Sequence, residues 1–528
     1  MIGLYRGPVT SSRDHMPLDW DVLMAALPFT IDHNANLNYG WDVKRRDLLN
    51  LMKTCHTLYR AGIPYLIKQI SFKGDFTLAT SLCDFILQDP HRADNVELVY
   101  LASFNQEPHV EDDQDHAIQM DKFITVLRLL RNVKTLHIDG PNALKLRSRG
   151  QELIDALAAL PAIREIDFRR MDEVDEKLVR SLQAPIVSAS LHWYEGWPDV
   201  PGTGTILAPH CAHLTSIELT HVPAFKPAVT FPLVHTFLHE NIYYPFERAG
   251  ELVDMFPSLK RLSLLASDEH SDLDDDEERE ELREENQRLL AESRHRWKNL
   301  DYFETTAWNA YVLGFSCTVT SFKLYQWLET EEEIIPFQIV LKDLRPSYLN
   351  FACDLDHFPA AELGGLLPNA ISQLTHLRIG FYWEDTKDLL DCRELLEEHL
   401  IKCLAGAPSL ACLTIKIRYN KTPRPHITQP HEPLMPVSVD ARAECRIATN
   451  RYLETLDTVK YVRRLSSHLP NLSFVSIQFK GGHQPTTYCS VTGKFESEGG
   501  DADVERLDEK LGRELLRRSW TGAKWRRE

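Results

Sequence analysis

Residues 257–264 read Pro257-Ser-Leu259-Lys-Arg-Leu262-Ser-Leu264, and this phrase decides the fold. Its last apolar residues alternate with polar ones, as they do in a short strand that buries one face. The run before it, from Ala249 to Phe256, has helical spacing, and Pro257 is suited to end that helix. The stretch therefore predicts a helix, a turn marked by proline and a short half-buried strand.

The same phrase recurs along most of the chain. Most successive copies are about 20–30 residues apart, a spacing that indicates stacked repeats, each of which needs neighbours to bury its apolar face. An ordinary α/β domain with a parallel sheet is the alternative, but the sequence has no glycine-rich nucleotide loop. We predict that the central apolar residues of the copies are buried in parallel strands of one curved sheet. They include Leu136, Ile166, Ile217, Leu262, Phe322, Leu377, Leu413 and Val475.

These copies resemble the leucine-rich repeat family from about residue 95 to residue 480. The resemblance implies an α/β fold, a leucine-rich-repeat solenoid (horseshoe). The family places Asn or Cys three residues after each strand, whereas this chain has residues such as Met171, Val222 and Tyr382 there. We therefore expect irregular repeats.

Two longer intervals between copies are interpreted as inserts, at about residues 268–296 and 421–447. Residues 268–285 hold 12 acids against two arginines, a balance of −10 that accounts for more than half of the net charge of −18. We expect Asp268–Glu278 to be a solvated loop and Glu280–Arg296 to form an exposed polar helix. The second insert carries five prolines and is expected to be an irregular loop.

Composition narrows the functional class. The longest apolar runs are too short for a membrane span, which needs about 20 residues, and the N-terminus has no apolar signal segment. We expect a cytoplasmic or nuclear protein that binds neither membrane nor nucleic acid, since no basic stripe is present. Ten cysteines occur without a Cys-x-x-Cys pair, so we expect no metal and no cofactor.

The N-terminal region differs from the repeats. Leu18, Val22 and Leu23 lie on one helical stripe after Pro17. A second amphipathic run follows, from Leu48 to Tyr59, with Gly62 placed to end it and Pro64 placed to open a third short segment. We expect residues 1–15 to be flexible, residues 16–75 to form a small helical domain, and residues 76–480 to form the array. Residues 481–528 would be a tail with an amphipathic helix.

The helical region resembles the F-box. The second half of that motif is matched by Leu51-Met-Lys-Thr-Cys55-His-Thr-Leu58-Tyr59 and then Tyr65-Leu66-Ile67, and the first half is matched loosely by Met16-Pro17-Leu18 through Val22-Leu23. About 20 residues separate the halves, more than the family usually shows. The residues that the resemblance assigns to the adaptor-binding surface are Pro17, Leu18, Val22, Leu23, Leu51, Cys55, Leu58 and Tyr65.

The resemblance also implies a function. F-box proteins with leucine-rich repeats are substrate-recognition subunits of SCF-type cullin-RING E3 ubiquitin ligases. The implied partners are the Skp adaptor, the cullin scaffold and an unknown protein substrate. Because the sequence lacks the common catalytic motifs, we expect no enzymatic activity in this chain. Two alternatives stay open: a leucine-rich-repeat scaffold whose N-terminal helices only cap the array, and an enzyme with an unrecognised site in a repeat loop.

Substrate binding is expected along the inner face of the repeats and the loop edge that follows the strands, between about residues 190 and 385. Residues beside the central apolar position point away from the core, and aromatic residues follow several strands. Aromatic side chains beside arginine are typical of binding hot spots. The candidates are Trp193, Tyr194, Arg261, Lys323, Trp327, Arg378, Tyr382 and Trp383. Rings that only fill the loop-side core are the competing interpretation.

Overall fold

The structure is a computed structural model of the chain. It describes residues 41–74, 76–104, 114–140, 149–194, 203–222, 229–242, 248–266, 276–367, 371–383, 391–419, 448–480, 485–492 and 503–520. The chain divides into two compact units, residues 1–185 and residues 186–528. This division falls among the repeats rather than at the end of the N-terminal helices.

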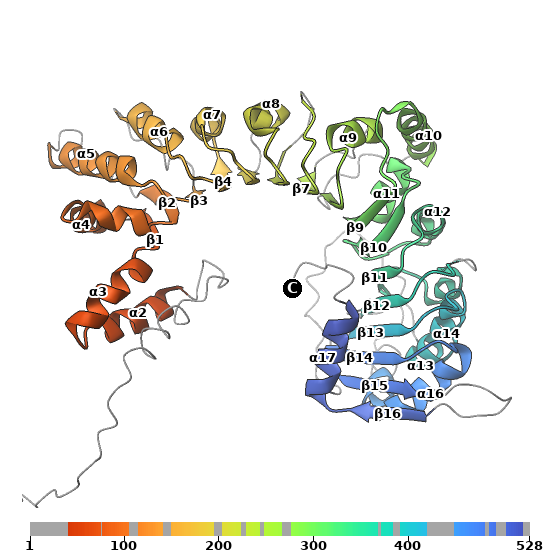
Figure 1. The fold of residues 1–528 in the computed structure, drawn as a ribbon. Helices are drawn as coiled ribbons and strands as arrows, with labels where there is room; N and C mark the ends of the chain where they lie inside the picture. The colour runs from red at the N-terminus through yellow and green to blue at the C-terminus, as the bar shows by residue number, and fades with distance from the viewer. Residues whose placement is uncertain are drawn as a thin grey trace, which may run out of the picture. The chain divides into compact units, whose positions relative to one another are not determined.

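Unit 1 combines a helical hairpin with the first four strands, each joined to the next by a helical segment (Figure 1). The strands pair in chain order. The first pair after the hairpin, β1 and β2, is parallel. The elements are α2 (Trp41–Met52), α3 (His56–Leu66), β1 (Gln69–Gly74), α4 (Phe76–Leu87), η2 (Pro90–Asn95), β2 (Leu98–Phe104), α5 (Gln114–Leu129), β3 (Thr135–Asp139), α6 (Gly150–Ala158), β4 (Glu165–Met171) and α7 (Glu173–Ser181).

Unit 2 continues the alternation of strand and helix, again with strands paired in chain order. Its strands are β5 (Ser188–Trp193), β6 (Ser216–Thr220), β7 (Thr236–Ile242), β8 (Arg261–Ala266), β9 (Asn299–Thr305), β10 (Thr318–Leu324), β11 (Tyr348–Asp354), β12 (His376–Trp383), β13 (Cys412–Tyr419), β14 (Phe474–Lys480), β15 (Thr487–Thr492) and β16 (Asp503–Leu507). Its helical segments are α8 (Thr203–Leu207), η3 (Ala208–His210), α9 (Ala249–Met255), α10 (Asp276–Glu292), α11 (Ala307–Leu313), η4 (Glu331–Glu333), α12 (Ile334–Leu344), η5 (Ala360–Gly365), α13 (Cys392–Glu394), η6 (Leu395–His399), α14 (Leu400–Leu404), α16 (Thr458–His468) and α17 (Glu509–Trp520).

The α/β repeat architecture is confirmed in both units. All eight predicted strand centres lie in β-strands with parallel pairing and are at most 2% exposed. Their neighbours at alternate positions share the same face, as in β12, where Leu377 and Ile379 are buried while His376 and Arg378 are partly exposed. The repeat pattern ends at β14, because β15 and β16 pair antiparallel.

Helices α9 to α14 and α16 of unit 2 cover one face of its sheet (Figure 1). The core lies between them and the sheet, and aromatic rings fill much of it: Phe303 is 5.6 Å from Phe322 on the next strand, between ring centroids. We call the opposite face of this sheet the inner face.

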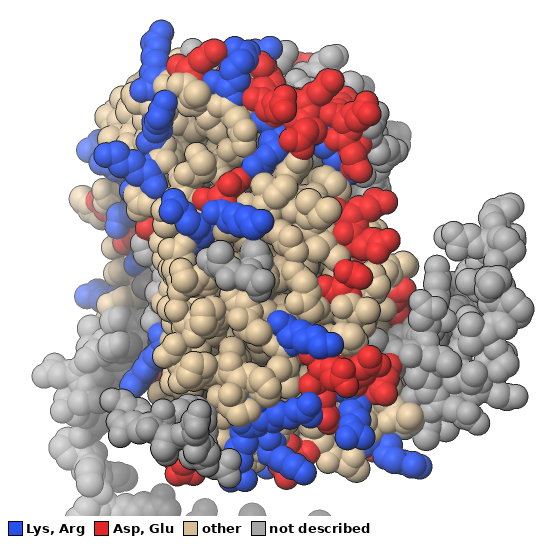
Figure 2. Space-filling model, turned by 90° about the vertical axis from the view of Figure 1, so that its right-hand side faces the viewer, with Lys and Arg blue, Asp and Glu red and all other residues tan. Residues whose placement is uncertain are grey.

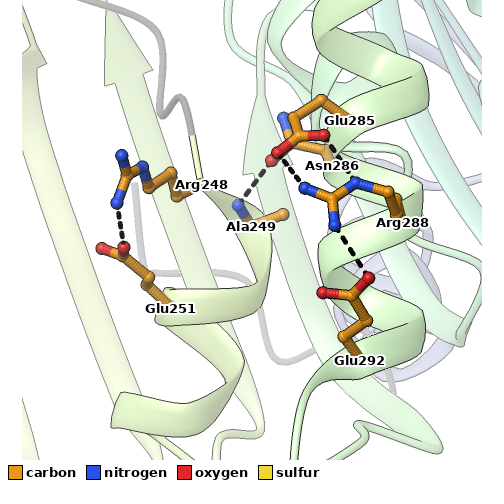
Figure 3. A network of polar contacts seen from close by, with 7 residues as sticks. All are labelled: Arg248, Ala249, Glu251, Glu285, Asn286, Arg288 and Glu292. Atoms are coloured by element: carbon orange, nitrogen blue, oxygen red, sulfur yellow. Dashed lines mark hydrogen bonds and ion pairs between the residues drawn. The ribbon is translucent and has the colours of Figure 1, made fainter.

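The acidic segment before β9 differs from its expected form. Residues 267–275 and 420–447 lie outside the described residues, but α10 begins at Asp276 and takes the place of a repeat helix between α9 and α11. It is not a solvated excursion, because Arg283 and Asn286 on its inward side are buried. The Asn286 side chain accepts a hydrogen bond from the N–H of Ala249 at 2.7 Å (Figure 3). It also donates a hydrogen bond to the carbonyl of Val312 at 3.0 Å.

The acids of α10 therefore face solvent on the outside of a packed helix. Arg288 bonds to Glu285 and Glu292 along the same helix (Figure 3). Figure 2 shows acidic side chains gathered along the upper and right-hand edge of the helix-covered surface instead of being spread evenly over it.

The N-terminal hairpin also differs in detail from the expected helices. The second run breaks at Cys55, whose thiol accepts a hydrogen bond from the N–H of Leu58 and so begins α3. Neither Gly62 nor Pro64 marks a boundary, because α3 continues through both to Leu66. Gly62 instead allows α2 and α3 to pack closely, because a Cβ at this position would lie 2.4 Å from the Cγ of Met52 on α2.

His239 gives unit 2 a pH dependence. This side chain is 1% exposed on the core side of β7, and burial lowers its pKa to about 4, although its hydrogen bond to the backbone of Val222 favours the charged form. An unfolded histidine has a pKa of about 6.5. Between pH 6.5 and 4, His239 therefore binds a proton in the unfolded chain but stays neutral in the folded chain. Stability is therefore lost as the pH falls through this window.

We expect the His239 contribution to amount to about 3 kcal/mol between pH 7 and pH 4. The His239→Leu variant should lose that much less stability over the window than the wild type, measured by urea unfolding at each pH. His235→Leu, an exposed position just before β7, is the control and should follow the wild type. Equal pH dependence of the wild type and His239→Leu would refute the assignment.

Candidate functional site

The inner face of unit 2 carries the candidate binding residues. Strand register places side chains from neighbouring strands side by side: Lys323 of β10 pairs with Glu304 of β9, and Arg378 of β12 pairs with Asn350 of β11. These positions alternate with the core leucines and are therefore turned away from the helices. The face thus presents a strip of polar and aromatic groups that crosses the repeats.

A polar cluster occupies this face at β8 to β10. The Glu304 carboxylate is 8% exposed and accepts hydrogen bonds from the hydroxyls of Tyr302, at 2.6 Å, and Ser263, at 3.2 Å. The Lys323 ammonium group lies 2.8 Å from the same carboxylate. The Arg261 guanidinium carbon is 5.2 Å from the centre of the Tyr302 ring. Two of the three predicted basic residues, Arg261 and Lys323, are therefore present in this cluster on the inner face, with Lys323 held in an ion pair.

An aromatic group lies farther along the face, where the strands end. The rings of Trp327 and Tyr382 are 4.3 Å apart, and the Arg418 guanidinium carbon is 4.9 Å from the Tyr382 ring. Trp327 is 38% exposed, and Arg418 is also exposed. We call Trp327, Tyr382 and Arg418 the aromatic patch. Cation–π contacts and half-exposed rings of this kind suit binding of another polypeptide.

Two of the predicted rings belong to the core, which corrects their assignment to an exposed rim. Trp193 is 2% exposed and Trp383 is 1% exposed. The alternation of buried and partly exposed residues runs to the end of each strand, so that Trp193 shares a face with Leu191 and Trp383 shares a face with Phe381. Tyr194, the next residue after Trp193, is 56% exposed.

Arg378 has a partner that the sequence did not reveal. Its guanidinium carbon is 5.1 Å from the ring of Trp520, at the end of α17. The same indole lies 5.9 Å from the Tyr348 ring and 5.8 Å from the His376 ring. The C-terminal helix therefore covers part of the predicted substrate surface. The sequence indicated that the tail contains an amphipathic helix, but nothing local indicated which surface that helix would cover.

The predicted adaptor residues fall into two groups. Pro17, Leu18, Val22 and Leu23 lie outside the described residues. Leu58 is buried in the hairpin core with Leu48 and Met52, while Leu51, Cys55 and Tyr65 are partly buried around that core. Two apolar residues absent from the prediction are exposed on the same hairpin, Leu49 at 36% and Tyr59 at 42%.

Unit 1 holds a buried pair that bears on the enzyme alternative. His137 Nδ1 lies 2.8 Å from Asp167, and His137 is 2% exposed and stacked on Tyr100. Burial opposes ionisation of Asp167, but the His137 hydrogen bond and nearby positive charge outweigh it and lower the pKa. Burial is the largest cause that raises the pKa of Tyr100 to about 12, and the hydrogen bond to the Asp139 carboxylate adds to it. The Tyr100 hydroxyl therefore stays protonated at neutral pH. The arrangement is a cross-strand polar contact between an imidazole and a carboxylate, and it contains no activated nucleophile.

Two kinds of site are absent from the described ranges. No group of three or more His, Cys, Asp or Glu side chains there is placed to hold a metal ion. Among the helices of those ranges, none combines the length and apolar content needed to cross a membrane.

Comparisons with known proteins give little further guidance. No family model and no curated protein matches the sequence. The chain is similar to a solved structure described as the Rad7 and Elc1 complex in yeast, with 11% identity over 74% of this chain and 97% of that chain. The TM-score is 0.33. At that TM-score the superposition is loose, and the functional proposal rests on the chain's own residues.

Proposed function

We propose that this chain is a substrate-recognition subunit of an SCF-type cullin-RING E3 ubiquitin ligase. In this proposal the hairpin α2–α3 docks on the Skp adaptor, the repeats bind a protein substrate, and other subunits carry out the chemistry in the cytoplasm or nucleus. The observation that carries the proposal is an F-box-like hairpin, directly before a repeat array, that has exposed apolar side chains beside a small core of Leu48, Met52 and Leu58 among its described residues.

The exposed side chains of the hairpin support a docking role. Leu49 on α2 and Tyr59 on α3 expose apolar area that a partner helix could bury, and apolar patches on small helical modules commonly mark interaction sites. Leu51 and Tyr65 lie partly buried beside the hairpin core and would support that surface.

Charges at the two exposed apolar positions should abolish adaptor binding. The double variant Leu49→Asp/Tyr59→Asp is expected to weaken binding of the purified Skp adaptor at least about 30-fold, because central apolar contacts typically contribute about 2 kcal/mol or more. Calorimetric titration of the full chain measures this.

The matched control is Asn50→Asp/Thr57→Asp, which adds the same two charges at exposed polar positions of α2 and α3. It should change the affinity less than about threefold. If both double variants bound the adaptor as tightly as the wild type, the hairpin would not be part of the interface. The alternative would then gain support: a scaffold whose helices only cap the array, as solenoid ends require.

For the substrate, we infer a site at the aromatic patch and the adjoining inner face. Trp327, Tyr382 and Arg418 offer an exposed ring, a partly exposed ring and a cation within one cluster, and Tyr325, two residues before Trp327 in the chain, is 45% exposed. Trp193 and Trp383 play no part in this inference, because both are core residues. The supported substrate feature is a polypeptide segment with apolar and acidic side chains, which would complement the rings and Arg418.

A further inference from the structure

The C-terminal helix α17 lies on the inner face of unit 2, opposite the other helices (Figure 1). It begins over β15, where the Tyr488 side chain fits against Gly512 so closely that a Cβ would lie 2.2 Å from the ring. Leu515 and Leu516 pack against Cys412, Phe474 and Tyr488 in the middle of its path. It ends with Trp520 between Tyr348, His376 and Arg378.

The sheet surface beneath α17 differs from the surface beneath the other helices. On the helix-covered side, β13 and β14 present Leu413, Ile415 and Ile477, all at most 1% exposed. On the inner face, the same strands present small polar side chains, among them Thr414 and Ser476, which are also fully buried. The Thr414 hydroxyl has no hydrogen-bond partner within the described part of the chain. Water could satisfy such groups, so exposing these polar side chains costs less than exposing the leucine and isoleucines of the other side.

Helix α17 also carries ion pairs within itself that favour the helical conformation independently of the sheet. Arg513 is paired with Glu509, and Glu514 accepts hydrogen bonds from both Arg517 and Arg518, all within the helix. Pairs at these spacings stabilise isolated helices. The helix is the last described element, and Asp508 alone joins it to β16 and caps its first turn.

We propose that the inner face of β11–β15 is a binding surface for an amphipathic helix, which α17 fills in the free protein and a helix of a partner protein fills in its place. The partner helix would present what α17 presents: a small residue where Gly512 meets Tyr488, leucines at the positions of Leu515 and Leu516, and an aromatic ring at that of Trp520. The contacts lie entirely within unit 2, so this surface does not depend on adaptor docking by the hairpin.

The most direct test uses the chain's own helix as the probe. A labelled peptide of residues 508–520 should bind a chain truncated after Leu507 at micromolar concentration, and should bind the full chain at least tenfold more weakly because α17 competes at high effective concentration. Peptides carrying Gly512→Leu or Trp520→Ala should bind the truncated chain at least tenfold more weakly than the unchanged peptide does. Equal binding to both chains, or no binding to a folded truncated chain, would overturn the proposal.

A reversible lock covers the case in which the truncated chain does not fold. The Cys412 thiol lies 3.6 Å from the Ser519 hydroxyl, so Ser519→Cys places two thiols together, and an added oxidant can remove two electrons and two protons to join them. In the full-length Ser519→Cys variant, peptide binding should disappear on oxidation and return on reduction. The Ser519→Ala control should be insensitive. Peptide binding that survives a verified disulfide would refute displacement.

Two further readouts separate this proposal from others. Adaptor affinity, measured on the same oxidised and reduced samples, should not change, so that failure of either proposal is seen independently. Light scattering should show a monomer at the concentrations used. A dimer that dissociates on removal of α17 would assign the surface to a second copy of this chain and would contradict the partner-helix proposal.

Discussion

Replacing Phe322 with alanine is expected to destabilise unit 2 by about 3–5 kcal/mol, the cost typical of a phenylalanine removed from a well-packed core. Phe322 is 0% exposed, lies opposite Phe303 on β9 and Leu349 on β11, and stacks on the Phe303 ring. Two neighbouring repeats would therefore share the resulting cavity. Hydrogen exchange of the β9–β11 amides measures the local loss directly.

Thr318→Ala, at an exposed position at the start of the same strand, is the matched control. It should cost no more than about 0.5 kcal/mol. If Phe322→Ala were as mild as this control, the Phe322 ring would not be a packed part of the core between the helices and the sheet.

Replacing Asn286 with leucine is expected to cost about 2–5 kcal/mol. Its amide satisfies the first N–H of α9 and a carbonyl in the last turn of α11, two backbone groups that their own helices leave without partners. Leucine has a similar volume but no polar atoms, so both groups would be buried unpaired at about 1–3 kcal/mol each. Thermal unfolding measures the total effect, and exchange of the Ala249 amide measures the local one.

Gln287→Leu, one residue along α10 and exposed, makes the same chemical change without these contacts. It should leave the melting temperature nearly unchanged and the Ala249 amide protected. Similar effects of the two variants would mean that α10 is an excursion rather than a structural helix of the array.

The sequence predicted the strands well because their information is local. The alternation of apolar and polar residues at Leu262 and its equivalents can be recognised within each strand's own sequence. All the predicted strand centres are buried. The helix α10 agrees with the polar helix expected in the acidic insert, but its expected exposure is wrong, because Arg283 and Asn286 are buried by contacts with α9, α11 and Asp343. Those contacts are distant in sequence, so only the fold reveals them.

The candidate site was predictable only in part for the same reason. Arg261 and Lys323 alternate with core residues and lie on the inner face as predicted. Trp193 is the last alternating position of its strand and shares the core face with Leu191, so its assignment to the exposed loop edge was wrong. The role of Arg378 depends on Trp520, more than a hundred residues farther along the chain, and no local pattern indicates that contact.

Hydrogen exchange of the full chain with and without saturating Skp adaptor tests the proposed receptor function most directly. We expect new protection concentrated in residues 41–66, the hairpin α2–α3 that presents Leu49 and Tyr59. We also expect unchanged exchange in β8–β13, where the substrate surface is proposed. Adaptor binding without protection of the hairpin, or no binding at micromolar concentration, would contradict the assignment of this chain as an adaptor-docked receptor.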